Sequence, residues 1–260
     1  SELDDPPTLQ EVESAISALK NNKAAGEDGI PSEVWKYGGE AVVRWIHSAI
    51  TSIWSSEEIP QSWKNSEIFL LWKNKGSKSD LSKYRTIALL ATGGKVLAKV
   101  IQRRVASHSE DKILKESCQW GFRTGRSTLQ PISIVRRLQE HAHEKGQQLH
   151  FAFLDLEKAY DSVNQAAMWK VMEKFGFPPK IINLIRNFHQ GQEVRVVQGS
   201  TACEPFSIET GLRQGCLLAP TLFLLYMEAL TLRMKRNVKQ SAGVLVRSRL
   251  DGDFFNLRRL

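Results

Sequence analysis

The chain has 260 residues, of which 42% are hydrophobic and 25% are charged, and its formal net charge is +8 at pH 7. These proportions exclude a generally disordered chain, and the length allows one large domain or two smaller ones. The positive charge favours a polyanionic partner, although charge alone is equally compatible with a basic protein that has none.

The number of cysteines and the hydropathy of the sequence indicate in which cellular compartment the protein is expected. Three cysteines, Cys118, Cys203 and Cys216, are too few and too scattered for a disulfide framework or a C-x-x-C zinc site, which indicates a reducing compartment. No signal peptide opens the chain, and no segment approaches the ~20 apolar residues of a membrane span. We therefore expect the cytoplasm and/or the nucleus, no membrane partner, and nucleic acid as the polyanion.

The periodicity of the apolar residues and the positions of glycine, proline and capping residues predict alternating helices and short strands. The first helix starts at a capping box, Thr8 to Glu11, and carries Val12, Ile16 and Leu19 on one face. The later elements are helices over 41–54, 94–105, 130–143 (capped by Thr128), 165–175, 178–188 and 220–236, and strands over 68–72, from about 84, over 151–155, and over 194–197 and 206–208 as a hairpin.

Two basic regions leave alternatives open. The glycine-rich turn over 21–31 is flanked by Lys20 and Lys23, and it fits a site for a template backbone as well as it fits a solvated loop. The helix over 94–105 carries Lys95, Lys99 and two arginines, for which a solvated face is the default interpretation.

One stretch organises the chain: Phe151-Ala-Phe-Leu-Asp155, followed by Leu-Glu-Lys-Ala-Tyr160-Asp161-Ser-Val. Four apolar residues before a carboxylate are typical of a buried strand that ends on Asp155. Such a carboxylate is stabilised either by backbone N–H groups or by cations, of which Mg²⁺ is one. The following segment predicts a helix that places Tyr160 and Asp161 over the strand end, where Asp161 more often has a structural role.

This stretch resembles the first palm motif of reverse transcriptases from non-LTR (LINE-like) retrotransposons. Five further segments follow in the order of that family: Ile59-Pro-Gln-Ser-Trp-Lys, Lys73-Asn-Lys-Gly-Ser-Lys, Tyr84-Arg85-Thr-Ile-Ala-Leu-Leu, Gly121-Phe-Arg-Thr-Gly-Arg-Ser-Thr128 and Gly211-Leu-Arg-Gln214-Gly215-Cys-Leu-Leu-Ala-Pro-Thr-Leu-Phe223. The resemblance implies an α+β right-hand polymerase fold with fingers over 1–149 and an incomplete palm over 150–260.

The resemblance also implies a two-metal nucleotidyl transfer that uses Mg²⁺ or Mn²⁺, an RNA template, a DNA primer and a dNTP; it leaves the oligomeric state open. Asp155 would be the catalytic carboxylate and, with the Leu156 carbonyl, a metal ligand. The residues implied in nucleotide binding are Tyr160 beneath the sugar, Gln214 and Gly215 at the second palm motif, Arg85 on the triphosphate, and Lys73 as a looser candidate. Without the resemblance, Tyr160 is predicted as a core tyrosine.

The third palm motif of the family, Tyr/Phe-x-Asp-Asp, does not occur in the 260 residues; the late pair Asp251-Gly-Asp253 lacks adjacency. One aspartate does not hold two metal ions, so we expect the chain as given to be inactive or nearly so as a polymerase. The alternatives are a catalytically dead nucleic-acid-binding remnant and, less well matched by the motifs, a group II intron maturase.

Overall fold

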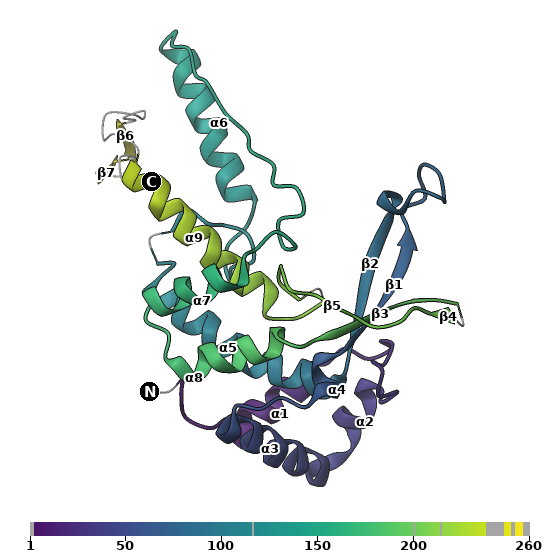
Figure 1. The fold of residues 1–260 in the computed structure, drawn as a ribbon. Helices are drawn as coiled ribbons and strands as arrows, with labels where there is room; N and C mark the ends of the chain where they lie inside the picture. The colour runs from purple at the N-terminus through teal and green to yellow at the C-terminus, as the bar shows by residue number, and fades with distance from the viewer. Residues whose placement is uncertain are drawn as a thin grey trace.

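A computed structural model describes residues 3–115, 117–199, 201–213, 215–237, 247–250 and 253–256 (Figure 1). The helices are α1 (Leu9–Ser17), α2 (Ser32–Tyr37), α3 (Gly39–Ser56), α4 (Gln61–Lys64), the 3₁₀ turn η1 (Leu81–Lys83), α5 (Thr92–Lys112), α6 (Leu129–Glu144), α7 (Gln165–Lys174), α8 (Pro179–His189) and α9 (Ala219–Asn237). The strands are β1 (Ser66–Trp72), β2 (Tyr84–Leu90), β3 (Glu193–Gln198), β4 (Thr201–Ala202), β5 (Phe206–Ser207), β6 (Arg247–Leu250) and β7 (Asp253–Asn256). The protein is therefore a mixed α+β molecule, as the sequence predicts.

Local signals account for several helix starts. Thr8 and Glu11 form the predicted capping box of α1, in which each side chain accepts the backbone N–H of the other residue. Pro179 occupies the first turn of α8, where its missing N–H costs nothing. The cap predicted at Thr128 is wrong: Thr128 precedes α6 but has helical dihedrals, and its side chain makes no capping hydrogen bond.

The main sheet has the order β2-β1-β3-β4, with β5 also paired to β3. β1 and β2 are antiparallel along their whole length, whereas β3 lies parallel to β1 only from Ser66 to Phe69. The outer half of the β1–β2 hairpin therefore projects beyond β3, and Figure 1 shows it extending away from the helices. β5 pairs with β3, which confirms the predicted hairpin.

The core lies around α5, whose residues Val96, Leu97, Val100, Ile101 and Val105 are all buried. α5 packs against α1, α4 and α9, and α7 packs against α8 and α9. One apolar cluster joins residues from Leu3 to Leu225. The division into fingers over 1–149 and palm over 150–260 remains a prediction.

The strand predicted over 151–155 is wrong. Residues 149–156 have no regular secondary structure, and Phe153 and Leu154 are each 84% exposed. Residues 157–162 form turns rather than the predicted helix, and α7 begins only after Asn164, whose side chain caps it. The physical reason is pairing: among the described residues, no strand lies beside 151–155 to accept its hydrogen bonds and cover its apolar side chains.

Candidate active site

The centre of the candidate site is a junction between two turns that are distant in sequence. The Gly211 N–H donates to the carbonyl of Val163 at 2.9 Å, and the Leu212 N–H donates to the carbonyl of Tyr160 at 2.9 Å. Gly211 has φ +82°, and a Cβ at this position would lie 2.8 Å from the Cα of Asp161. Only glycine permits this approach, so the turn after Tyr160 and the turn at Gly211 form one unit.

The ring of Tyr160 is held between two other aromatic rings. It stacks on Phe223 of α9, with a centroid distance of 4.7 Å and an interplanar angle of 25°. Phe122 meets it edge-on at 6.4 Å and 86°. Tyr160 is half-buried, and its desolvation raises the pKa of the phenol, so the hydroxyl stays protonated at neutral pH. The tyrosine belongs partly to the core, as predicted from the residues alone, and the residue is not fully covered.

Gly215 carries the same junction onto the sheet. It has φ +73°, and a Cβ here would lie 3.0 Å from the carbonyl oxygen of Ala88 on β2. Ala88 pairs with Ile68 of β1, which pairs in turn with Val196 of β3, so this turn lies over the part of the sheet where β2, β1 and β3 are all paired. Gly215 thus brings its backbone close to β2, whereas its predicted approach to the nucleotide stays a prediction, and Gln214, its predicted neighbour in the site, lies outside the described residues.

Arg213 ties the junction to the base of the hairpin, which the sequence analysis did not foresee. Its guanidinium donates to the carbonyls of Trp63 at 3.0 Å and Asn65 at 2.9 Å, immediately before β1 begins. The same group lies 4.8 Å from the centroid of the Phe188 ring. Arg213 is 3% exposed, and desolvation lowers its pKa to about 10, so it remains charged at neutral pH.

Arg85 and Lys73 lie on the projecting part of the hairpin. Arg85 is exposed on β2 and pairs with Leu71, three residues from Ala88, which places it roughly 10 Å along the strand from the Gly215 contact. Lys73 follows β1 directly, and its ammonium donates to the carbonyl of Ser82 at 2.9 Å. Arg85 is therefore exposed about 10 Å along β2 from the Gly215 contact, with its side chain on the opposite strand face from that of Ala88, whereas Lys73 is engaged within the hairpin.

Asp155 is exposed in the irregular segment 149–156, five residues before Tyr160 and hence at most about 18 Å from it along the chain. The Asp155 carboxylate and the Leu156 carbonyl are the oxygen donors that Mg²⁺ prefers, and Mg²⁺ completes its coordination with waters and substrate phosphates. Among the described residues, no three His, Cys, Asp or Glu side chains converge to hold a metal ion. The donors present suit part of one coordination sphere and are incomplete for two ions.

One buried titratable group, His189, ends the neighbouring helix α8. His189 is fully buried; its Nδ1 bonds the carbonyl of Ile185 at 2.8 Å, and its ring meets Trp169 edge-on at 5.7 Å. Desolvation, with a smaller contribution from the positive charge of Arg213, lowers its pKa to about 4. The imidazole is therefore neutral at pH 7, and it belongs to the packing of α8 rather than to a reacting centre.

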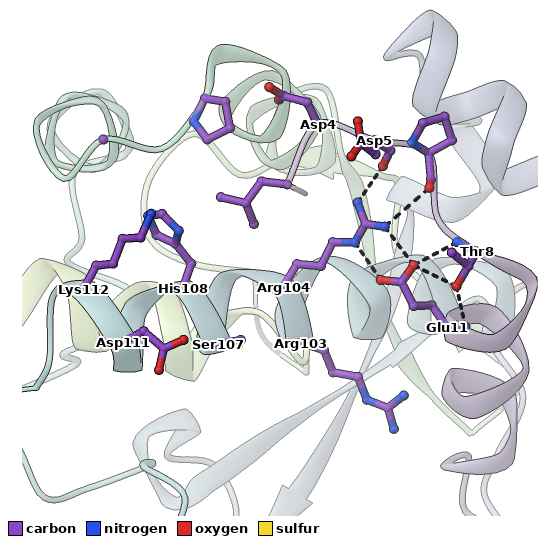
Figure 2. Close-up of a pocket in the computed structure, with 14 residues that line it drawn as sticks. Asp4, Asp5, Thr8, Glu11, Arg103, Arg104, Ser107, His108, Asp111 and Lys112 are labelled. Atoms are coloured by element: carbon purple, nitrogen blue, oxygen red, sulfur yellow. Dashed lines mark hydrogen bonds and ion pairs between the residues drawn. The ribbon is translucent and has the colours of Figure 1, made fainter. Parts of the chain in front are cut away.

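A pocket of about 890 Å³ lies apart from these residues, between the N-terminal segment and α5 (Figure 2). Arg104 crosses it and binds the carboxylate of Glu11 at 2.7 and 2.8 Å and the carbonyl of Asp5 at 2.6 Å. The pocket's lining includes none of the residues predicted for nucleotide binding. Because Arg104 bonds both Glu11 and the backbone of Asp5 across it, we interpret the pocket as the seam that fastens the N-terminal segment.

Comparison with known proteins decides the family. The family model described as "Reverse transcriptase (RNA-dependent DNA polymerase)" matches residues 73–245, which include both turns of the junction. This chain belongs to the reverse transcriptase family.

Similar proteins come from mobile elements. The chain is 28% identical to the "RNA-directed DNA polymerase from mobile element jockey" of Drosophila funebris, over 85% of this chain and 24% of the relative. It is 27% identical to the "Transposon TX1 uncharacterized 149 kDa protein" of Xenopus laevis, over 87% of this chain and 17% of the relative. A third relative, the "Probable RNA-directed DNA polymerase from transposon X-element" of Drosophila melanogaster, is 26% identical over 83% of this chain and 24% of the relative. The chain thus spans about a quarter or less of the length of these proteins.

Family membership confirms the resemblance seen in the sequence and classifies this reverse transcriptase chain as a nucleotidyltransferase by family. The described helices include none long and apolar enough to cross a membrane. Arg213 and Phe122 lie within the family-like motifs, but their residue types alone assign them no role. Their arginine and phenylalanine types were visible, whereas the burial of one and the exposure of the other depend on the fold.

Proposed function

We propose that this chain forms the template- and nucleotide-binding part of an RNA-directed DNA polymerase with a right-hand fold, in which residues 1–149 act as fingers and residues 150–260 as part of the palm. The observation that carries the proposal is the junction, because it unites three predicted elements. The Tyr160 turn is bonded to the Gly211 turn, and the Gly215 turn lies on the strand that carries Arg85.

In this proposal an incoming dNTP extends from Tyr160 to the edge strand β2, which carries Arg85. The exposed Arg85 guanidinium binds the triphosphate through two parallel hydrogen bonds. The ring of Tyr160, fixed by its stack on Phe223, lies under the sugar and excludes a 2′-hydroxyl, which selects deoxynucleotides. Gln214 and Gly215 contact the nucleotide or template, and Lys73 contributes positive charge from the hairpin.

The family normally uses a divalent metal. We propose that the Asp155 carboxylate and the Leu156 carbonyl contribute to the coordination of Mg²⁺ or Mn²⁺, with nucleotide phosphates as further ligands. The ion, when bound, offsets negative charge on the phosphates and the reacting oxygens. The partners are an RNA template, a DNA primer and a dNTP, and the compartment is the cytoplasm and/or the nucleus.

Two measurements on the purified chain test this function. The first is binding of single-stranded RNA at several salt concentrations: affinity should fall steeply as salt rises, because lysine and arginine side chains displace counterions from the phosphates. The second is primer extension with Mg²⁺ and dNTPs, for which we expect little or no product. Binding that is absent at low salt contradicts the proposal.

A gain-of-function experiment separates the polymerase from the alternative, a nucleic-acid-binding remnant without turnover. The remnant is favoured by the irregular, exposed segment around Asp155 and by the lack of three converging metal ligands among the described residues. Appending a β-hairpin that carries two adjacent aspartates should restore extension, and Asp155→Ala should abolish the restored activity. Robust extension by the unmodified chain that Asp155→Ala removes contradicts the expected inactivity, whereas RNA binding without any restored extension supports the remnant.

A further inference from the structure

Phe122 has a strained backbone and an exposed aromatic side chain, and neither feature stabilises the fold. Its backbone has φ +58°, in the left-handed region, where a bulky side chain is strained. The residue is 69% exposed, so it gains little from burial. The other described non-glycine residues with positive φ are asparagines, a glutamate and a lysine. Strain of this kind, at a residue that does not contribute to the core, is typical of a functional contact.

The surrounding loop holds Phe122 in this conformation. The neighbouring Arg123 is 7% exposed, and its guanidinium binds both carboxylate oxygens of Glu110 on α5, at 2.9 and 2.7 Å. The same group donates to the carbonyl of Gln119 at 3.0 Å. These bonds fix the backbone on either side of Phe122 and direct its ring away from the core.

The ring of Phe122 extends an aromatic series that begins in the core. Phe223 on α9 stacks on Tyr160, and Tyr160 meets the edge of Phe122 at 6.4 Å. Positive charge accompanies this series, because the Arg126 guanidinium lies 5.2 Å from the centroid of the Trp120 ring in the same loop. Exposed aromatic rings beside cations are the arrangement with which proteins stack the bases of single-stranded nucleic acid.

We propose that Phe122 is a base-stacking residue: its exposed ring contacts a nucleobase beside Tyr160, and the loop tolerates the strained backbone in order to present it. This inference rests on the proposed nucleic-acid function. It adds to that function a stacking contact between Phe122 and a nucleobase. The nucleobase belongs either to the template strand or to the incoming dNTP, which share the same flat π-face.

The test exploits the opposite effects expected on stability and on binding. Phe122→Gly removes both the ring and the strain, so we expect Tm to rise by about 2–4 °C while the affinity for single-stranded RNA falls about tenfold. Phe122→Leu keeps the strain and the apolar bulk, so Tm should stay within about 1 °C of the unmodified chain while binding weakens. Phe122→Trp should retain binding. Trp45→Ala, which removes a 65% exposed ring on α3, is the matched control and should leave affinity unchanged.

Two probes identify the base. A 2-aminopurine base placed in a single-stranded oligonucleotide reports stacking through quenching of its fluorescence, and free dNTP binding is measured separately by calorimetry. Loss of quenching in Phe122→Gly assigns the contact to the strand, and loss of dNTP affinity assigns it to the nucleotide. A fall in Tm for Phe122→Gly, or equal effects of Phe122→Gly and Trp45→Ala, would overturn the stacking role while leaving the proposed function intact. Absence of RNA binding by the unmodified chain overturns both.

Discussion

At the scale of single residues, the junction depends on a glycine whose hydrogen atom faces another backbone. Gly211→Ala adds a methyl group 2.8 Å from the Cα of Asp161 and also imposes φ +82° on an alanine. We expect a loss of about 3 kcal/mol in the free energy of unfolding, which urea denaturation measures.

A second glycine separates the effect of the steric clash from the effect of the positive φ. Gly176 has φ +79°, but a Cβ there would meet no atom within 4 Å. Gly176→Ala should therefore cost only about 1 kcal/mol, from backbone strain alone. Equal losses for the two variants would show that the Tyr160 and Gly211 turns do not pack as described.

His189 makes stability depend on pH in a defined window. Because burial lowers its pKa from 6.5 to about 4, the unfolded chain binds a proton between these values that the folded chain does not. The free energy of unfolding should fall as pH drops from 6.5 towards about 4, by about 3 kcal/mol in total, and this contribution should then level off. The group's contribution is fully present above pH 6.5.

Urea titrations at several pH values check this expectation. His189→Asn retains a side-chain group that can bond the Ile185 carbonyl and removes the titration. Its stability difference from the unmodified chain should be largest at pH 7 and shrink as pH approaches 4. Parallel pH profiles for the two chains contradict a neutral, buried imidazole.

At the scale of elements, Arg213 fixes the orientation of the β1–β2 hairpin relative to the junction. Arg213→Met keeps the length and apolar contacts of the side chain but leaves the carbonyls of Trp63 and Asn65 without their donor. We expect a loss of about 2–4 kcal/mol in stability and faster hydrogen exchange at the hairpin base.

The matched control is Arg195→Met on β3. Arg195 forms an exposed ion pair with Glu27 at 3.9 Å, with 46% of its side chain accessible. Its loss should cost less than about 1 kcal/mol. Comparable effects of the two substitutions, or unchanged exchange at Ser66 in Arg213→Met, would exclude Arg213 as the link.

At the scale of the whole molecule, Arg104 fastens the N-terminal segment to the core. Besides its bonds to Glu11 and Asp5, it lies 5.0 Å from the centroid of the Trp54 ring (Figure 2 shows the bonds). Arg104→Met should therefore release the segment before α1, which limited proteolysis detects as early cleavage near Asp5.

The Arg104–Glu11 pair also makes stability depend on pH. Here a hydrogen bond to the charged form lowers the pKa, whereas at His189 desolvation lowers it. The hydrogen bond from Arg104 lowers the pKa of Glu11 from 4.5 to about 2. Its stabilisation is present above pH 4.5 and is lost as pH falls towards 2, and because Glu11 is about one-third exposed we expect only about 1–2 kcal/mol. An Arg104→Met chain that loses as much stability between pH 4.5 and 2 as the unmodified chain contradicts this.

Prediction from sequence succeeded where local chemistry decides structure. The capping box at Thr8, the strand over 68–72 and the strand from about 84 depend on residues close in sequence, and all three are confirmed. It failed at 151–155, because the burial of an apolar segment requires a neighbour that composition does not reveal. It also missed the role of Arg213, since the acceptor carbonyls lie about 150 residues earlier in the chain.

The sequence likewise predicts some residues of the candidate site and not others. Family motifs located Tyr160, Gly215 and Arg85, and the fold brings the first two to one junction with the third on the adjoining strand. The exposure of Phe122 and the pairing of Arg123 with Glu110 depend on where α5 ends relative to the loop, which no local pattern specifies.

The parallel pairing of β1 with β3 has a consequence for synthesis. When the β1–β2 hairpin leaves the ribosome, β3 has yet to be translated. The edge of β1 that carries Ile68 and Phe69 therefore stays unpaired while α5, α6 and α7 emerge. An unpaired apolar edge recruits other nascent chains. Docking of β3 is what covers this edge, and we therefore expect chaperone dependence to end only once residues 193–198 are free of the exit tunnel.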